Sequence, residues 1–338
     1  MKKLNKFWVV VLTLIAVLFC FVACGEPDPV PPTHEHTTTY VGAKSAGEYV
    51  HGYKAHYRCD CGAFFLAANG EEVSWNEIVI RSTTGFDKQT YTKNNYTLNY
   101  CLYEPEDLDK SEDKVPLILF LHGAGERGNN NEAQLKNAIK EVIKAGNEDS
   151  AWMNSIVIAP QCPAANNASV GTSNVNDPNK WAETNWTQGN YTQANVPESS
   201  PLKAAAELVQ QYANYDYVDE DRVYVIGLSM GGFGTWDILA RYPNLFAAGV
   251  PICGGGPTDK IDVLKNIPIY TFHGTADGSV PYSGTQAMYN AITAAGGNKI
   301  TFYTFQGAGH GIWNNAITFA GSGTQYPALE TWLFAQHK

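Results

Sequence analysis

The 338-residue sequence has little positive charge, since 23 lysine and arginine residues face 33 aspartate and glutamate residues, for a net charge of −10. Nucleic-acid binding depends on clustered Lys and Arg, so we expect no nucleic-acid partner. The rest of the composition, 44% hydrophobic and 12% aromatic, is that of a globular protein. The length fits one domain of about 250 residues with appendages.

Cysteine is also sparse, with seven residues in the whole chain. Two of them, Cys20 and Cys24, lie near the N-terminus, and five follow later: Cys59, Cys61, Cys101, Cys162 and Cys253. An odd number cannot pair completely within one chain, and the sequence does not decide which pairs form.

An uncharged hydrophobic run occurs at residues 7–23, after a basic start, and ends at Ala23-Cys24. This arrangement resembles a bacterial lipobox. It predicts a lipoprotein signal peptide at residues 1–24, lipidation of Cys24, and a proline-rich tether at residues 25–33. The protein is then anchored in the membrane at the extracellular face of a bacterial cell. An ordinary signal peptide or a short transmembrane anchor remains the alternative.

Residues 34–78 read as a small separate module that contains several His and Cys residues. It resembles the short His/Cys modules of surface proteins in Gram-positive bacteria. The candidate metal ligands are His51, His56, Cys59 and Cys61, although a C-x-C spacing departs from the usual C-x₂-C of structural zinc sites. The alternative is a small β module that is held by aromatic packing, with or without a disulfide.

From residue 79 onward, apolar strand patterns alternate with helical ones, which predicts an α/β fold with a mostly parallel central sheet. A half-buried antiparallel strand is expected around residues 96–102. Buried strands are expected at residues 115–121, 156–160, 223–228, 247–253, 267–272 and 300–305. Helices are expected around residues 135–143, 200–212, 233–241, 287–295 and 328–336.

The sequence Gly227-Leu228-Ser229-Met230-Gly231 lies between an expected strand and an expected helix. G-x-S-x-G in this context predicts a sharp turn that exposes a nucleophilic serine above the sheet. An ordinary glycine turn is the alternative. A serine nucleophile needs a base and an acid, which follow it as Ser, acid, His in this type of fold. Asp277 and His310 each follow a later strand in that order.

Other residues were weighed as acid or base: Asp259, Asp262 and His273. The oxyanion hole is expected from the backbone N–H of Met230 and one N–H in the loop after the third strand. Ala124 is the first choice for this second donor and Gly125 the second choice. We expect His122 to support that loop.

Four motifs identify a family resemblance: LHGAGERG at residues 121–128, APQCP at 159–163, GLSMGG at 227–232 and PICGGG at 251–256. Together they resemble bacterial secreted α/β-hydrolase esterases of the phospholipase/carboxylesterase and dienelactone-hydrolase group, often labelled predicted peptidases. The resemblance covers residues 85–338. It implies a serine carboxylesterase, without a cofactor, that acts on ester decorations of plant polysaccharide such as feruloyl or acetyl groups. A serine peptidase and a catalytically silent carbohydrate-binding protein remain alternatives.

Residues 164–199 form a long, nearly uncharged stretch that is typical of a lid or a binding wall. It contains Trp181 and Trp186, and Trp313 follows His310 by three positions. These three tryptophans are the candidate substrate-binding residues, because flat aromatic rings suit a sugar or a phenolic acyl group. The alternative is that they fasten the loop to the body of the protein.

Overall fold

The computed structural model describes residues 37–47, 51–59, 61–68, 70–80, 82, 85–106, 108–144, 147–164 and 179–338. The expected signal peptide, the lipidation site at Cys24 and the tether lie outside these residues. The chain forms two compact units. The smaller unit comprises Met1–Gly42 and Ala55–Ile78, and the larger one comprises Ala43–Lys54 and Val79–Lys338.

The module that we expected at residues 34–78 is therefore interrupted, since residues 43–54 belong to the larger unit. In this segment β2 (Gly52–Tyr53) pairs antiparallel with β6 (Val79–Ile80). The N–H of His51 also donates to the carbonyl of Phe86 at 2.8 Å. These backbone hydrogen bonds between residues about 30 positions apart leave no local pattern in the sequence.

The smaller unit contains a four-stranded antiparallel sheet with the order β1-β3-β4-β5. Its elements are β1 (Thr38–Val41), β3 (His56–Cys59), β4 (Phe64–Phe65), β5 (Glu72–Val73) and the short helix α2 (Trp75–Ile78). Aromatic contacts hold the sheet: the rings of Tyr40 and Tyr57 lie 5.3 Å apart, and those of His56 and Phe64 lie 5.6 Å apart.

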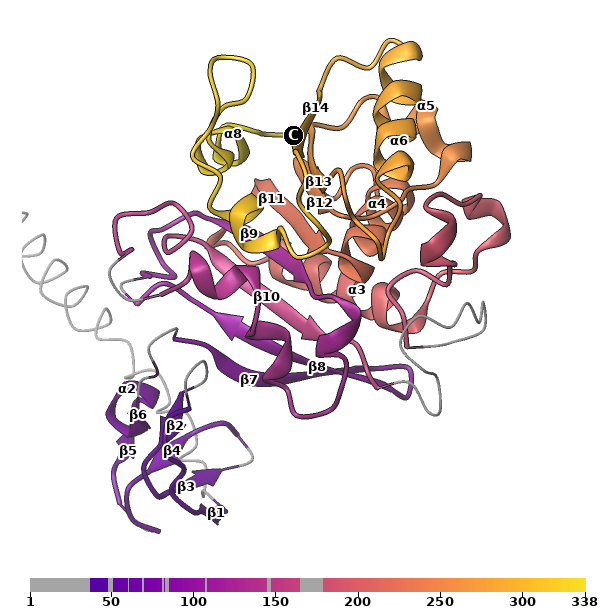
Figure 1. The fold of residues 1–338 in the computed structure, drawn as a ribbon. Coiled ribbons are helices and arrows are strands. Elements are labelled where there is room, and N and C mark those ends of the chain that lie inside the picture. The colour runs from indigo at the N-terminus through magenta and orange to yellow at the C-terminus, as the bar shows by residue number, and fades with distance from the viewer. Residues whose placement is uncertain are drawn as a thin grey trace, which may run out of the picture. The chain divides into compact units, whose positions relative to one another are not determined.

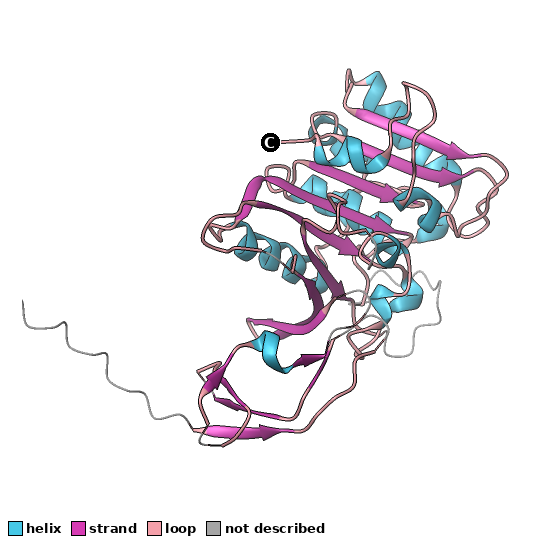
Figure 2. Ribbon diagram, turned by 90° about the vertical axis from the view of Figure 1, so that its left-hand side faces the viewer, coloured by secondary structure: helices cyan, strands magenta, loops and turns pink. Residues whose placement is uncertain are grey.

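The larger unit is built on an eight-stranded sheet with the order β14-β13-β12-β11-β9-β10-β8-β7 (Figures 1 and 2). The strands are β7 (Asp87–Lys93), β8 (Tyr96–Tyr103), β9 (Val115–Leu121), β10 (Ile156–Gln161), β11 (Val218–Leu228), β12 (Ala248–Ile252), β13 (Ile269–Gly274) and β14 (Ile300–Phe305). In this order, β14, β13, β12, β11, β9 and β10 pair parallel with their neighbours. β8 pairs antiparallel with β10 and with the edge strand β7. The expected mostly parallel α/β sheet is confirmed.

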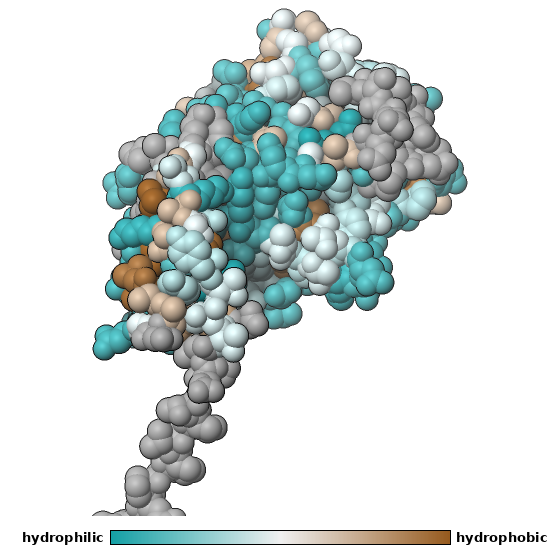
Figure 3. All heavy atoms as spheres, turned by 90° about the horizontal axis from the view of Figure 1, so that it is seen from below, coloured by the Kyte–Doolittle hydropathy of each residue, from teal (hydrophilic) through white to brown (hydrophobic). Residues whose placement is uncertain are grey.

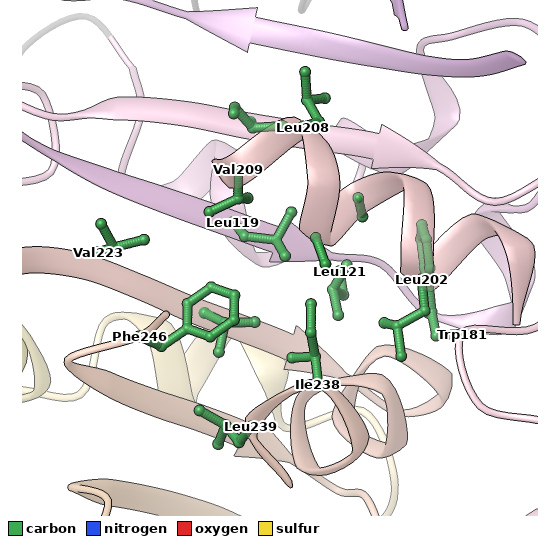
Figure 4. Close-up of a cluster of buried hydrophobic side chains, with 14 of the residues drawn as sticks. Leu119, Leu121, Trp181, Leu202, Leu208, Val209, Val223, Ile238, Leu239 and Phe246 are labelled. Carbon is green, nitrogen blue, oxygen red and sulfur yellow. The ribbon is translucent and has the colours of Figure 1, made fainter. Parts of the chain in front are cut away.

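Both faces of this sheet are covered, because side chains along each strand alternate between two hydrophobic clusters. On β9, Leu117, Leu119 and Leu121 enter one cluster, whereas Ile118 and Phe120 enter the other. The first cluster contains side chains of α3 (Ser200–Ala213), α4 (Met230–Arg241), α5 (Ile261–Leu264) and α6 (Tyr282–Ala294), and Figure 4 shows part of it. The second contains side chains of α7 (Trp313–Ile317) and α8 (Leu329–Phe334).

The helix that we expected around residues 135–143 is instead two 3₁₀ segments, η2 (Ala133–Leu135) and η3 (Ala138–Glu141). Ala138 has φ of 53°, outside the helical region, and its N–H donates to Oδ1 of Asn314 at 2.8 Å. The apolar side chains that suggested a helix, such as Leu135 and Ile139, are nevertheless buried. The spacing of these side chains correctly predicted that they are buried, but it wrongly predicted an α-helix.

The surface of the described residues carries scattered large hydrophobic side chains, namely Tyr40, Leu66, Ile80 and Tyr215. Hydrophilic residues predominate on the face shown in Figure 3. Within the described part of the chain, no helix has the length and hydropathy of a membrane span.

Candidate active site

Ser229 occupies the sharp turn between β11 and α4, and its φ of 53° and ψ of −117° are rare for a residue with a side chain. Its N–H donates to the carbonyl of Ile252 at 2.8 Å. Two glycines make the turn sterically feasible. A Cβ on Gly227 would strike the carbonyl of Gly231, and one on Gly231 would strike the carbonyl of Leu121. Strain of this kind is typical of functional sites.

The structure brings the three residues predicted for catalysis together. Oγ of Ser229 lies 2.7 Å from Nε2 of His310, and Nδ1 of His310 lies 2.7 Å from Oδ2 of Asp277. Asp277 follows β13 and His310 follows β14, so the parallel strands deliver both to the edge where β11 delivers Ser229. Because a carboxylate only accepts, Nδ1 carries a proton and Nε2 can accept one from the serine.

The carboxylate of Asp277 is surrounded by donors. Oδ1 accepts from the N–H groups of Ser279 at 2.8 Å and Val280 at 3.0 Å. Oδ2 faces His310 at 2.7 Å and His273 at 3.0 Å. Burial opposes the charged form, but the hydrogen bonds from the two histidines and the two N–H groups hold the pKa of Asp277 well below its usual range.

None of the rival acids and bases contacts the serine in the way His310 does. Asp259 accepts from the N–H groups of Gln193 and Ala194, and Asp262 pairs with Lys265 on the surface. The ring nitrogens of His273 contact Asp277, Val280 and Thr285, whereas His310 contacts the serine.

The loop expected to form the oxyanion hole rests on His122, which is fully buried. Nδ1 of His122 donates to the carbonyl of Gly123 at 2.6 Å, and Nε2 accepts from the N–H of Cys162 at 2.9 Å. Burial lowers the pKa of His122 to about 4, so the ring is neutral at pH 7. The carbonyl of His122 accepts from the indole N–H of Trp181 at 2.9 Å.

Ala124 and Gly125 line the same cavity as Ser229 and His310, and Met230 is the first residue of α4, directly after the serine. The two expected oxyanion donors thus belong to segments that meet at Ser229.

Two neighbouring residues that we did not single out from the sequence also fix this loop. Nε of Arg127 donates to the carbonyl of Ala124 at 3.1 Å. Oε1 of Glu126 accepts from the amide of Asn137 at 2.8 Å, and burial raises the pKa of Glu126. Both residues lie in the LHGAGERG motif, so their position in that motif was the available signal.

A cavity of about 480 Å³ opens at Ser229 and is lined by Trp186 and Trp313 among other residues. The ring of Trp313 lies 5.3 Å from that of His310 in an edge-to-face arrangement. The Nε1 atom of Trp186 is buried and has no hydrogen-bond partner among the described residues. Lys180 lies 5.0 Å above the ring of Trp186.

Trp181 was wrongly expected to bind substrate. Its side chain is fully buried in the core beside Leu202 (Figure 4). Its Cβ also lies where a side chain at Gly234 would be. Trp181 therefore fastens the loop to α4 and to the oxyanion loop, which was the alternative interpretation.

Among the described residues, the group with three metal-binding atoms close together is Cys253, His273 and Asp277, within 4.8 Å of one another. The expected ligands of the small module do not form such a group, and His51 lies in the larger unit, where Nδ1 accepts from the N–H of Ser82 at 2.8 Å. Burial and the charge of Asp277 raise the pKa of the Cys253 thiol. That thiol stays protonated, and the carboxylate already accepts hydrogen bonds at both oxygens. The three residues therefore fit a hydrogen-bonded carboxylate better than a metal site.

The chain is similar in sequence to known esterases. The chain is 28% identical to carboxylesterase SOBER1 from Arabidopsis thaliana over 230 residues, which is 64% of this chain and 88% of that protein. It is 30% identical to the bifunctional acetylxylan esterase/xylanase XynS20E from Neocallimastix patriciarum, over 83 residues, or 25% of this chain and 12% of that protein.

The solved structure of a thermostable esterase has the same fold, with a TM-score of 0.62 at 24% identity over 92% of this chain and 79% of that one. The phospholipase/carboxylesterase family model matches residues 108–326, more than half of the chain. The chain belongs to the phospholipase/carboxylesterase family and has the α/β-hydrolase fold.

Proposed function

We propose that this carboxylesterase-type hydrolase works through a serine nucleophile and an acyl-enzyme. One observation carries the proposal: Ser229, His310 and Asp277 form a continuous chain of two hydrogen bonds, each 2.7 Å long. Nucleophile, base and orienting acid within hydrogen-bond reach are the requirements for activating a serine.

In the proposed reaction His310 accepts the proton of Ser229 as its Oγ attacks the ester carbonyl. Asp277 holds the ring in the required tautomer and stabilises the imidazolium. The N–H groups of Met230 and Ala124 bind the oxyanion. His310 then protonates the leaving alcohol, and a water molecule repeats the sequence on the acyl-enzyme to release the acid.

The proposed substrate is an ester decoration of plant polysaccharide, with a feruloyl or acetyl group as acyl part. One feature of the cavity supports an aromatic substrate, because Trp186 and Trp313 provide aromatic walls. Since Lys180 lies over the ring of Trp186, we assign the stacking contact to Trp313.

The experiment compares the full chain with Ser229→Ala on feruloyl, acetyl and 4-nitrophenyl esters and on peptides. We expect ester hydrolysis and fluorophosphonate labelling by the wild type, and loss of both in the variant with unchanged circular dichroism. A variant within tenfold of wild-type turnover would exclude Ser229 as nucleophile. Peptide cleavage that exceeds ester cleavage would favour a peptidase, and a folded but unlabelled wild type would favour a binding protein.

A further inference from the structure

A second histidine touches the acid of the proposed triad. His273 is the fifth residue of β13 and is fully buried. Its Nε2 lies 3.0 Å from Oδ2 of Asp277, the oxygen that also faces His310, and 3.2 Å from the carbonyl of Val280. Its Nδ1 lies 2.7 Å from Oγ1 of Thr285, on α6.

These contacts determine which ring nitrogen of His273 carries the proton. Both neighbours of Nε2 are oxygens that only accept, so Nε2 must be the donor. Nδ1 faces the oxygen of Thr285 at 2.7 Å. The single hydroxyl proton of Thr285 is donated to the carbonyl of Gly254 at 2.8 Å, which accepts the indole N–H of Trp236 at 3.3 Å as well. The contacts with Asp277 and Val280 are therefore the ones that assign Nε2 its donor role.

We propose that His273 is a positioning residue for the serine mechanism: its Nε2–H fixes the carboxylate of Asp277 in the orientation that His310 requires. The inference rests on the proposed function and adds a fourth residue to it. His273 does not touch the serine, so its effect is transmitted through Asp277.

The arrangement has a physical consequence for the proton affinity of the site. A donor on Oδ2 withdraws negative charge from the oxygen that faces His310, and a carboxylate with less charge stabilises the imidazolium less. The titratable groups that face His273 are Asp277, the Cys253 thiol within 4.8 Å and Tyr282, whose ring lies edge-on at 5.8 Å. Of these, the carboxylate is the one within hydrogen-bond distance of Nε2.

The test compares two variants of the full chain on one soluble nitrophenyl ester, with Ser229→Ala as control for the proposed function. His273→Leu removes the donor. His273→Gln keeps an N–H₂ group at a similar reach.

We expect kcat of His273→Leu to fall roughly 10- to 100-fold, the effect of losing one hydrogen bond to a charged group, with KM within a few-fold of wild type. The acid limb of its kcat/KM profile should move to higher pH by about half a unit to one unit. His273→Gln should restore most of the loss.

Wild-type kcat and an unmoved pH profile in His273→Leu would overturn the inference. Equal losses in the Leu and Gln variants, with a lower melting temperature and an unmoved profile, would also overturn it and leave His273 a packing residue. If the wild type itself is inactive and unlabelled by fluorophosphonate, the proposed function fails first, and the two failures are distinguishable.

Discussion

The neutral, buried ring of His122 predicts that the protein loses stability in mild acid. In the folded state Nε2 of His122 accepts from the N–H of Cys162, so it cannot take up a proton without breaking that bond. In the unfolded chain the ring is free to protonate. Burial lowers the pKa of His122 from 6.5 to about 4, and only the unfolded state binds the proton between these two values.

The sign and the size follow from this difference. Stability from the neutral ring is complete above about pH 6.5 and is lost as the pH falls toward about 4, because the unfolded state then binds more protons. Each unit between the two pKa values corresponds to about 1.4 kcal/mol. The gap predicts a loss on the order of 3 kcal/mol between pH 7 and pH 4, a large fraction of the stability of a typical domain.

The assay is urea unfolding of the wild type and of His122→Gln at pH 7 and pH 4.5, followed by circular dichroism. Glutamine offers a donor and an acceptor but does not titrate in this range. We expect the variant to be less stable at pH 7 and to lose less free energy than the wild type on acidification. All other titratable groups are common to the two proteins, so their contributions cancel in the comparison.

Equal losses in the two proteins would refute the reasoning, because the acid lability would then come from other groups. A wild type that is as stable at pH 4.5 as at pH 7 would also refute it.

Four further predictions concern single residues. Asp277→Asn should lower kcat on the order of 10⁴-fold through the wrong imidazole tautomer, which turnover measures. Its stability should also fall less than that of the wild type below about pH 4, because there the unfolded wild-type chain protonates Asp277 while the native carboxylate stays charged; unfolding at several acid pH values measures this. Trp181→Ala should lower the free energy of unfolding by about 3–5 kcal/mol without changing the ratio of kcat/KM between large and small esters. Trp186→Ala removes one aromatic wall of the cavity and should weaken kcat/KM about tenfold on a feruloyl ester but not on a nitrophenyl ester. Cys24→Ala should abolish labelling of the protein by fatty acid in bacterial cells.

The strands of the larger unit could be predicted closely because their signals are local. The apolar run at residues 115–121 coincides with β9, since a strand covered on both faces needs apolar side chains at every position. The turn at Ser229 could also be predicted, because glycines at positions 227 and 231 are required by contacts within a few residues of the serine and with the adjacent strand.

The misses have a common physical cause, which is that the deciding contacts are distant in sequence. The N–H of Ala138 leaves the helical pattern for a side chain 176 residues away. Trp181 follows a stretch without periodicity, and its partner, the carbonyl of His122, lies 59 residues away. The link between His273 and Asp277 had a local signal in their spacing of four residues, but the shared oxygen that gives it meaning also requires His310.

The interrupted course of the chain has a consequence for proteolytic release of the enzyme. The backbone crosses between the smaller and the larger unit after residues 42, 54 and 78, so a single nick severs one of three covalent connections. After a cut at residue 78, the N-terminal fragment still contributes residues 43–54 to the larger unit through the β2–β6 pairing. If Cys24 anchors the protein, a cleavage at residue 78 would leave the hydrolase attached to the cell through β2. Release from the cell would require a cut that separates residues 43–54 from Cys24.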